Sequence, residues 1–122
     1  MVDAHLIIAV FHIVAVVPLL LYVGFQRAAT VEWVYHLLFG LGLLIIAYHG
    51  IKAFNRWLAK SPSIWVNLVH ALIVAPLLLW IGYFGKKTER PAYEMLVLVA
   101  FGALGYHIKT LVLTAQTFSK GD

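Results

Sequence analysis

The stretch HIVAVVPLLLYVGF, from His12 to Phe25, has a close second copy in HALIVAPLLLWIGY, from His70 to Tyr83. The two copies lie 58 residues apart (70 − 12). Both begin with a histidine, reach a proline six positions later, continue with three leucines and end in glycine followed by an aromatic residue. A segment of this kind written twice in a chain of 122 residues predicts an internal repeat.

The repeat continues beyond these stretches when the chain is laid over itself at the same offset without a gap. Apolar sequences match one another readily by chance, but matches of histidine, proline, glycine, threonine and tyrosine at a single offset are not explained in this way. We therefore predict a duplication, with residues 1–58 as the first unit and residues 59–122 as the second. The further identities are Thr30 with Thr88, Tyr35 with Tyr93, Tyr48 with Tyr106 and His49 with His107.

The composition indicates a membrane protein. Apolar residues make up 63% of the chain and charged residues only 11%, whereas a soluble domain carries about 25% charged residues. The net charge of +4 comes from residues at the ends of the apolar segments, so it is typical of a membrane surface and does not predict nucleic-acid binding. The absence of cysteine excludes disulfides, cysteine-held clusters and thiolate-ligated haem.

Four apolar segments are long enough to cross the hydrocarbon core, which takes about 20 helical residues. An open strand would leave its backbone groups unsatisfied in lipid, so each segment is predicted to be a helix. We expect Asp3, Thr30, Ser61 and Thr88 to lie at the helix starts, with Pro62 in the first helical position. The predicted helices span residues 4–26, 31–54, 62–84 and 89–114.

Each repeat unit is thus predicted to be a helical hairpin. Two crossings return the chain to its starting side, so both hairpins have the same orientation and are related by a pseudo-twofold axis along the membrane normal. The predicted fold is an all-α, multi-pass bundle of four transmembrane helices with both termini on one side. Five basic residues on that side against four on the other favour the cytoplasm for the termini, under the positive-inside rule.

The two prolines have a structural interpretation. Pro18 and Pro76 each remove one hydrogen bond inside a predicted helix and are expected to kink it near the middle of the bilayer. Curvature of the bundle is the preferred explanation, with a gating hinge as the alternative.

The histidines are the strongest functional signal. His12 lies about 13 Å along the first helix, at 1.5 Å per residue, and His49 lies about 8 Å from the end of the second. Because these helices run in opposite directions, both residues fall in the leaflet nearer the termini. The repeat places His70 and His107 at the same depths, giving the symmetry-related pairs His12/His70 and His49/His107.

Several other residues complete this candidate site. Tyr35 and Tyr93 lie on the same helical stripes as His49 and His107, and Tyr48 and Tyr106 precede those histidines. His5 and His36 have no copies and are predicted to lie at the membrane surfaces.

Three explanations of the histidines stay open. They could be satisfied polar packing contacts, ligands of a haem or metal, or parts of a proton or ion pathway. A bare divalent ion is disfavoured because the acids of the spans, Glu32, Glu89 and Glu94, lie in the opposite leaflet. Haem b is easier to accommodate because the porphyrin dianion neutralises ferrous iron. The paired histidines resemble, in concept, those of membrane b-type cytochromes, one type of which pairs alternate helices. The small difference in depth between the pairs favours one haem over two.

The sequence does not predict an enzyme, since it has no phosphate-binding loop, no H-E-x-x-H motif and no nucleophile beside a base. A structural or assembly role in a membrane is the preferred function, with the lipid bilayer and either further copies of the chain or other membrane proteins as partners.

Two segments carry a resemblance at the level of the whole chain. YHGIKAF, at residues 48–54, and GKKTERPAYEM, at residues 85–95, are similar to segments of small multi-spanning membrane proteins encoded by large DNA viruses of protists and algae. The resemblance implies a protein of a virion or host membrane and no catalytic residues.

Overall fold

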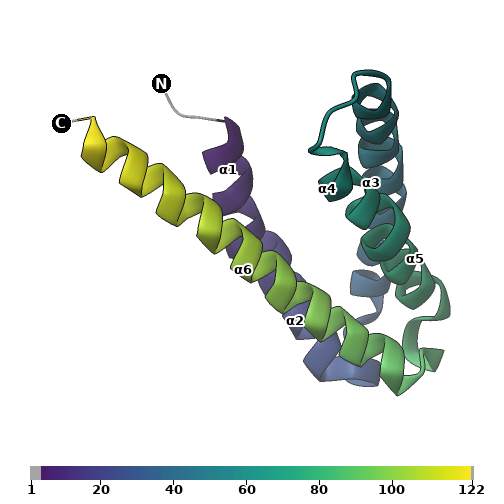
Figure 1. Cartoon of the computed structure of the whole chain (residues 1–122). Helices are drawn as coiled ribbons and strands as arrows, with labels where there is room; N and C mark the ends of the chain where they lie inside the picture. Colours follow the sequence, from purple (N-terminus) through teal and green to yellow (C-terminus); the bar gives the residue numbers. More distant parts are fainter. Residues whose placement is uncertain (1–3, 122) are drawn as a thin grey trace. The chain divides into compact units, whose positions relative to one another are not determined.

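The computed structural model describes residues 4–121, and those residues form helices joined by short turns (Figure 1). The first half contains α1 (Ala4–Phe11), the π-helical η1 (His12–Val16), α2 (Val17–Gln26), the 3₁₀-helical η2 (Arg27–Ala29) and α3 (Glu32–Leu58). The second half contains α4 (Ile64–Val69), the π-helical η3 (His70–Val74), α5 (Ala75–Phe84), the 3₁₀-helical η4 (Gly85–Lys87) and α6 (Arg90–Lys120).

Four continuous helical stretches are long and apolar enough to cross a membrane: Ala4–Ala29, Glu32–Leu58, Ile64–Lys87 and Arg90–Lys120. The prediction of four such helices is confirmed. The second stretch continues to Leu58 instead of residue 54, and the fourth continues to Lys120 instead of residue 114. The sequence boundaries were short because polar residues follow the apolar core of each helix, and helical structure continues through them.

The predicted helix starts were wrong in detail. Pro62 lies in a turn, and the third span begins two residues later at Ile64, after Ser63. Thr30 and Thr88 end the two 3₁₀ segments instead of capping the helices that follow. Asp3 lies outside the described residues. Threonine and proline mark the correct turns here, but the backbone at the two threonines is extended, with ψ of 137° at Thr30 and 133° at Thr88.

Each proline follows a π-helical segment. Pro18 and Pro76 are the second residues of α2 and α5, and η1 and η3 end directly before those helices. Val17 N–H bonds the carbonyl of His12, and Ala75 N–H bonds that of His70, which is the i→i+5 pattern. Proline has no N–H to give to the carbonyl four residues before it. A shift to the wider π register one turn earlier accommodates that missing donor without ending the span.

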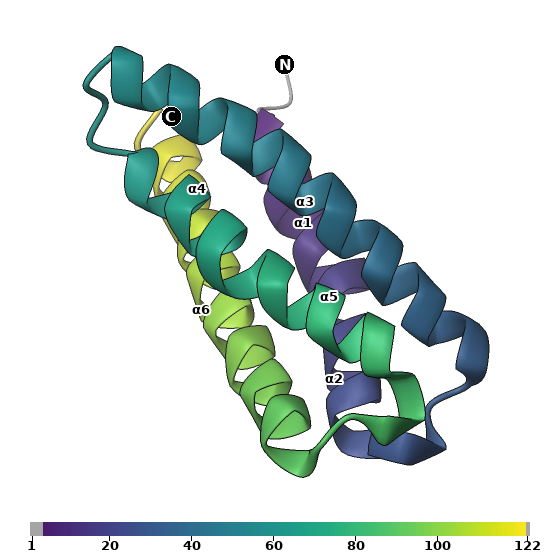
Figure 2. The same cartoon turned by 90° about the vertical axis from the view of Figure 1, so that its right-hand side faces the viewer.

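The chain forms two compact units, each of which brings together segments from both halves of the sequence. Unit 1 comprises Met1–Phe25 and Glu94–Asp122, so it contains most of the first span and most of the last. Unit 2 comprises Gln26–Tyr93 and contains the two middle spans with the turns at their ends. Within unit 2, α3 runs back along α4, η3 and α5 (Figure 2).

Unit 2 is held by a close approach of two helices. A Cβ atom built on Gly82 would lie 2.7 Å from the backbone nitrogen of Phe39, and one on Gly42 would lie 2.8 Å from Leu79. Two spans can therefore touch backbone to backbone, which is how small residues promote helix association in lipid. Large apolar side chains fill the rest of this interface: Leu38, Leu78 and Ile81 are fully buried.

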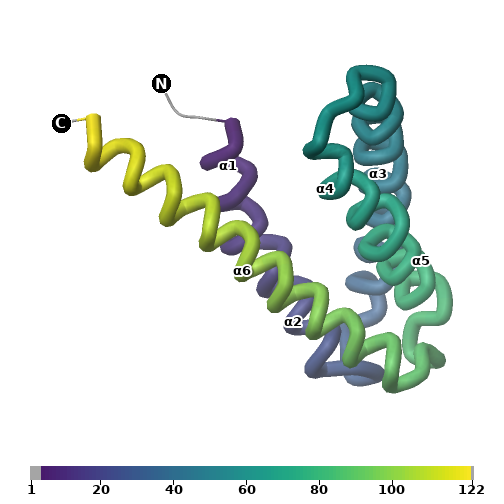
Figure 3. Tube along the Cα trace, in the orientation of Figure 1, coloured from purple at the N-terminus to yellow at the C-terminus, as the bar shows by residue number. Residues whose placement is uncertain are grey.

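A short loop joins the two spans of unit 2 (Figure 3). Ser61 N–H bonds the carbonyl of Arg56 at 2.9 Å, and Lys60 N–H bonds that of Trp57 at 3.1 Å. This pair of bonds is the Schellman motif, with Lys60 in the left-handed position at φ 54°. The side chain of Arg56 then bonds the carbonyl of Ser63 at 3.1 Å. The last turn of α3 is thus tied to the start of the next span.

Candidate functional site

Two histidines of unit 2 stack face to face. The ring centroids of His49, on α3, and His70, the first residue of η3, are 4.2 Å apart, with 14° between the ring planes. His49 Nδ1 lies 2.9 Å from Oδ1 of Asn67, and His70 Nδ1 lies 2.7 Å from the carbonyl oxygen of Val66. Each histidine therefore has one nitrogen fixed by an oxygen of the third span.

These contacts set the tautomers of both rings. Carbonyl and amide oxygens only accept hydrogen bonds, so Nδ1 must carry the proton in His49 and in His70. A neutral ring protonated at Nδ1 leaves Nε2 as its acceptor. Two neutral imidazoles can stack in an apolar helix pair, whereas two imidazolium ions at this distance would repel.

Unit 1 contains a second stack. The centroids of His12, the first residue of η1, and His107, on α6, are 4.3 Å apart, with 25° between the planes. His12 Nδ1 bonds the carbonyl of Ile8 at 2.7 Å, in the same way that His70 bonds Val66 four residues before it. His107 is buried, with 7% of its surface exposed. The histidine that begins each π segment thus makes the same two contacts, a bond from Nδ1 to the carbonyl four residues earlier and a stack on a histidine of another span.

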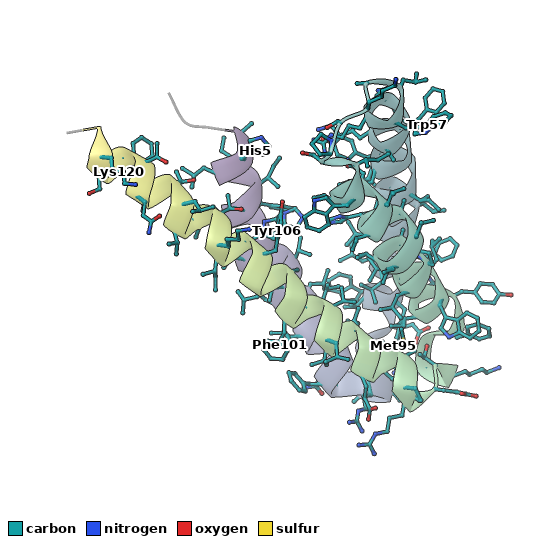
Figure 4. The ribbon with its side chains drawn as sticks, in the orientation of Figure 1. His5, Trp57, Met95, Phe101, Tyr106 and Lys120 are labelled. Atoms are coloured by element: carbon teal, nitrogen blue, oxygen red, sulfur yellow. The ribbon has the colours of Figure 1, made fainter. Side chains whose placement is uncertain are left out.

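The ring contacts join histidines that the repeat does not relate to each other. The predicted pairs, His12 with His70 and His49 with His107, are symmetry-related positions and specify no ring contact. The structure stacks each one on the non-duplicate partner in its own unit. His5 and His36 are exposed. In Figure 4, His5 lies at the start of α1.

The predicted tyrosines have two different roles. Tyr35 and Tyr93 are buried at the turn end of unit 2, where their hydroxyl oxygens lie 2.8 Å apart. They hydrogen-bond to each other and to backbone carbonyls. Their position on the same helical stripes as His49 and His107 had suggested hydrogen bonds to histidines instead. Tyr48 and Tyr106 are exposed and lie edge-on to the histidines that follow them in the chain. Figure 4 shows Tyr106 on α6.

Hydrogen bonds of an exposed lysine join the two turns of unit 2. Lys86 Nζ donates to the carbonyls of Ala28, at 2.9 Å, and Thr30, at 3.1 Å. From the sequence, Lys86 is only one of the four basic residues predicted on the side opposite the termini. The repeat offset was the available signal for this contact, because Lys86 and Ala28 are 58 residues apart and so occupy corresponding turns.

Asn67 is the site residue that sequence reasoning missed. It is 2% exposed and accepts the hydrogen bond of His49. An amide inside an apolar run was a visible signal, but Asn67 has no polar counterpart at the repeat offset. At the repeat offset, Asn67 corresponds to Ala9, which is fully buried in unit 1. The two histidine pairs therefore differ in their surroundings.

The geometry limits what each pair can hold. Among residues 4–121, no group of three or more His, Cys, Asp or Glu side chains is placed to hold a metal ion. A metal held between two imidazoles takes about 2 Å on each side to its nitrogens, with the rings in line and not face to face. Centroids 4.2 and 4.3 Å apart leave no room for a porphyrin between the stacked rings.

Comparison of the chain with protein families, with curated proteins and with solved structures finds no match.

Proposed function

We propose that the chain is a non-enzymatic, multi-pass membrane protein with a structural role, built from two duplicated hairpins. The observation that carries this proposal is that its histidine rings, one of them buried and three half-buried, stack on one another within the spans. In each unit a histidine from one span stacks on a histidine from another. Nδ1 of at least one ring in each stack is hydrogen-bonded to a backbone carbonyl of its own helix. Side chains used in this way join helices, and they leave the outer apolar residues to contact lipid.

Local structure supports the duplication. The π segments begin at His12 and His70, and the 3₁₀ segments begin at Arg27 and Gly85. Both pairs of positions differ by the sequence offset of 58. The backbone takes the same unusual positive φ at both 3₁₀ starts, 52° at Arg27 and 54° at Gly85. Two unrelated segments would have no reason to repeat two irregular features at one spacing.

The test replaces each stack by phenylalanines, which keep a ring but have no nitrogens. One variant is His12→Phe/His107→Phe, and the other is His49→Phe/Asn67→Ala/His70→Phe. Both proteins and the wild type are purified in detergent and reconstituted in liposomes. We expect intact helical circular dichroism in all three, no Soret band with or without added hemin, and proton flux equal to that of empty liposomes.

Two results would contradict the structural role. A Soret band that appears in the wild type and is lost in a phenylalanine variant would assign the histidines to haem. A flux that the variants abolish, with a pH dependence near the histidine pKa of about 6.5, would assign them to proton transfer. His5→Phe is the matched control, because this exposed histidine belongs to neither stack.

One observation favours ligation of a haem or another metal centre as a second candidate function. His12 and His70 both donate Nδ1–H to a backbone carbonyl at 2.7 Å. Metal-binding histidines commonly have this arrangement, which orients the ring and leaves Nε2 as the ligand. For this function the rings would have to leave their stacks, and the hemin arm of the experiment above tests it.

A further inference from the structure

Asn67 brings an unpaired hydrogen-bond donor into the apolar interior of unit 2. Its Oδ1 accepts a hydrogen bond from His49 Nδ1–H, but its Nδ2 is buried and has no partner. An amide group buried without its hydrogen bonds loses its hydration without compensation, which destabilises the folded state. The hairpin does not require this residue, because the corresponding Ala9 lies at the same place before a π segment and is equally buried.

His70 contributes an acceptor beside this donor. Its Nδ1–H is bonded to Val66, so its Nε2 carries the lone pair. Residues three apart on a helix lie on the same face, which places Asn67 and His70 next to each other. Both also contact the ring of His49, one by a hydrogen bond and the other by stacking. The donor Nδ2–H of Asn67 and the acceptor Nε2 of His70 therefore both lie beside the ring of His49.

The pairing of one donor with one acceptor selects the chemistry of a ligand. A carbonyl group could accept from Asn67 but could not donate to His70. An ammonium group could donate to His70 but could not accept from Asn67. A hydroxyl group does both through a single oxygen atom.

We propose that Asn67 and His70 bind one hydroxyl group inside unit 2. Asn67 Nδ2–H donates to the hydroxyl oxygen, and the hydroxyl hydrogen is donated to His70 Nε2. Water is one source of this group and a hydroxyl-bearing lipid is the other. His12 in unit 1 has the same Nδ1 bond, but Ala9 supplies no donor there, so the site belongs to unit 2 alone. The proposal does not depend on the structural role, since it concerns a ligand of one polar cluster.

The chain offers an internal control for the test, because its only two asparagines are the buried Asn67 and the exposed Asn55. Protein labelled with ¹⁵N at asparagine and histidine is reconstituted in nanodiscs of an ether-linked phosphatidylcholine without hydroxyl groups. The side-chain NH₂ signals are assigned by Asn67→Ala and Asn55→Ala. We expect a cross peak from the Asn67 amide to a slowly exchanging hydroxyl proton, and an upfield ¹⁵N shift of His70 Nε2 relative to the Asn67→Ala protein.

The outcomes separate the two sources and can overturn the proposal. A cross peak in the hydroxyl-free lipid identifies water. A cross peak that appears only after addition of a sterol or diacylglycerol identifies a lipid hydroxyl. The absence of a cross peak in all these lipids, with the same His70 Nε2 shift in wild type and Asn67→Ala, would show that no hydroxyl is bound. If Asn67→Ala does not fold, the wild-type cross peak of Asn67 compared with that of Asn55 decides the question.

Discussion

The hydroxyl oxygens of Tyr35 and Tyr93 lie 2.8 Å apart, and these two residues occupy equivalent positions of the sequence repeat. Each hydroxyl also contacts a carbonyl eight residues earlier, that of Arg27 at 2.7 Å and that of Gly85 at 3.0 Å. The two phenols together have two protons for these three contacts, so one contact is weaker than a full hydrogen bond. The shared bond connects α3 to α6 at the turn end of unit 2.

We expect removal of either hydroxyl to destabilise unit 2 by about 1 kcal/mol, the usual net value of a hydrogen bond. Tyr93→Phe leaves Tyr35 its shorter bond to Arg27 and removes the contact with Gly85. Tyr35→Phe should cost at least as much, because it removes the shortest contact. Denaturant titrations of the single and double variants in detergent measure the coupling. Tyr48→Phe, at an exposed tyrosine, should leave stability unchanged, and equal losses at all three positions would disprove the role of the hydroxyl pair.

The turn residues Arg27 and Gly85 should respond oppositely to substitution. Gly85 has φ 54° and ψ −129°, a conformation that L-residues rarely adopt, so Gly85→Ala should destabilise the protein by about 1–3 kcal/mol. Arg27 has φ 52° although it has a side chain, so Arg27→Gly should remove strain and raise the melting temperature. Thermal unfolding followed by circular dichroism measures both changes. A loss of stability in Arg27→Gly would show that contacts of the arginine side chain outweigh the strain.

Two glycines of the spans should also differ sharply. A Cβ atom on Gly82 would lie 2.7 Å from the Phe39 nitrogen and 2.8 Å from the Tyr35 carbonyl oxygen, and neither backbone atom can move without separating α3 from α5. We expect Gly82→Ala to lower the melting temperature by several degrees or to prevent folding. Gly50→Ala is the control, because nothing lies within 4 Å of its Cβ position. That substitution should raise stability by up to about 1 kcal/mol through helix propensity. Similar effects at the two positions would refute the close contact.

The sequence predicts the local structure of this chain better than its pairing. Apolar length was sufficient for four helices because backbone groups in lipid need an internal partner. The offset of 58 singled out four histidines as candidate site residues, because polar residues that recur at one spacing are conspicuous in apolar segments. The repeat could not show which histidines touch, because it relates equivalent positions and contact depends on which helices are neighbours. The π segments were also beyond prediction, since the loss of one N–H at Pro18 or Pro76 can be absorbed by a kink or by a change of helical register.

The last prediction uses the one polar residue that distinguishes the two stacks. His49→Phe removes the donor of Asn67 Oδ1 and leaves a buried amide without a side-chain partner in the chain. We expect His49→Phe to lower the free energy of unfolding by about 1–3 kcal/mol, the usual cost of an unsatisfied buried amide. Adding Asn67→Ala should restore most of that loss, because the unsatisfied amide is then gone. Denaturant titration of the wild type, His49→Phe, Asn67→Ala and the double variant gives a double-mutant cycle. Additive effects of the two substitutions would show that the bond between His49 and Asn67 contributes nothing to stability.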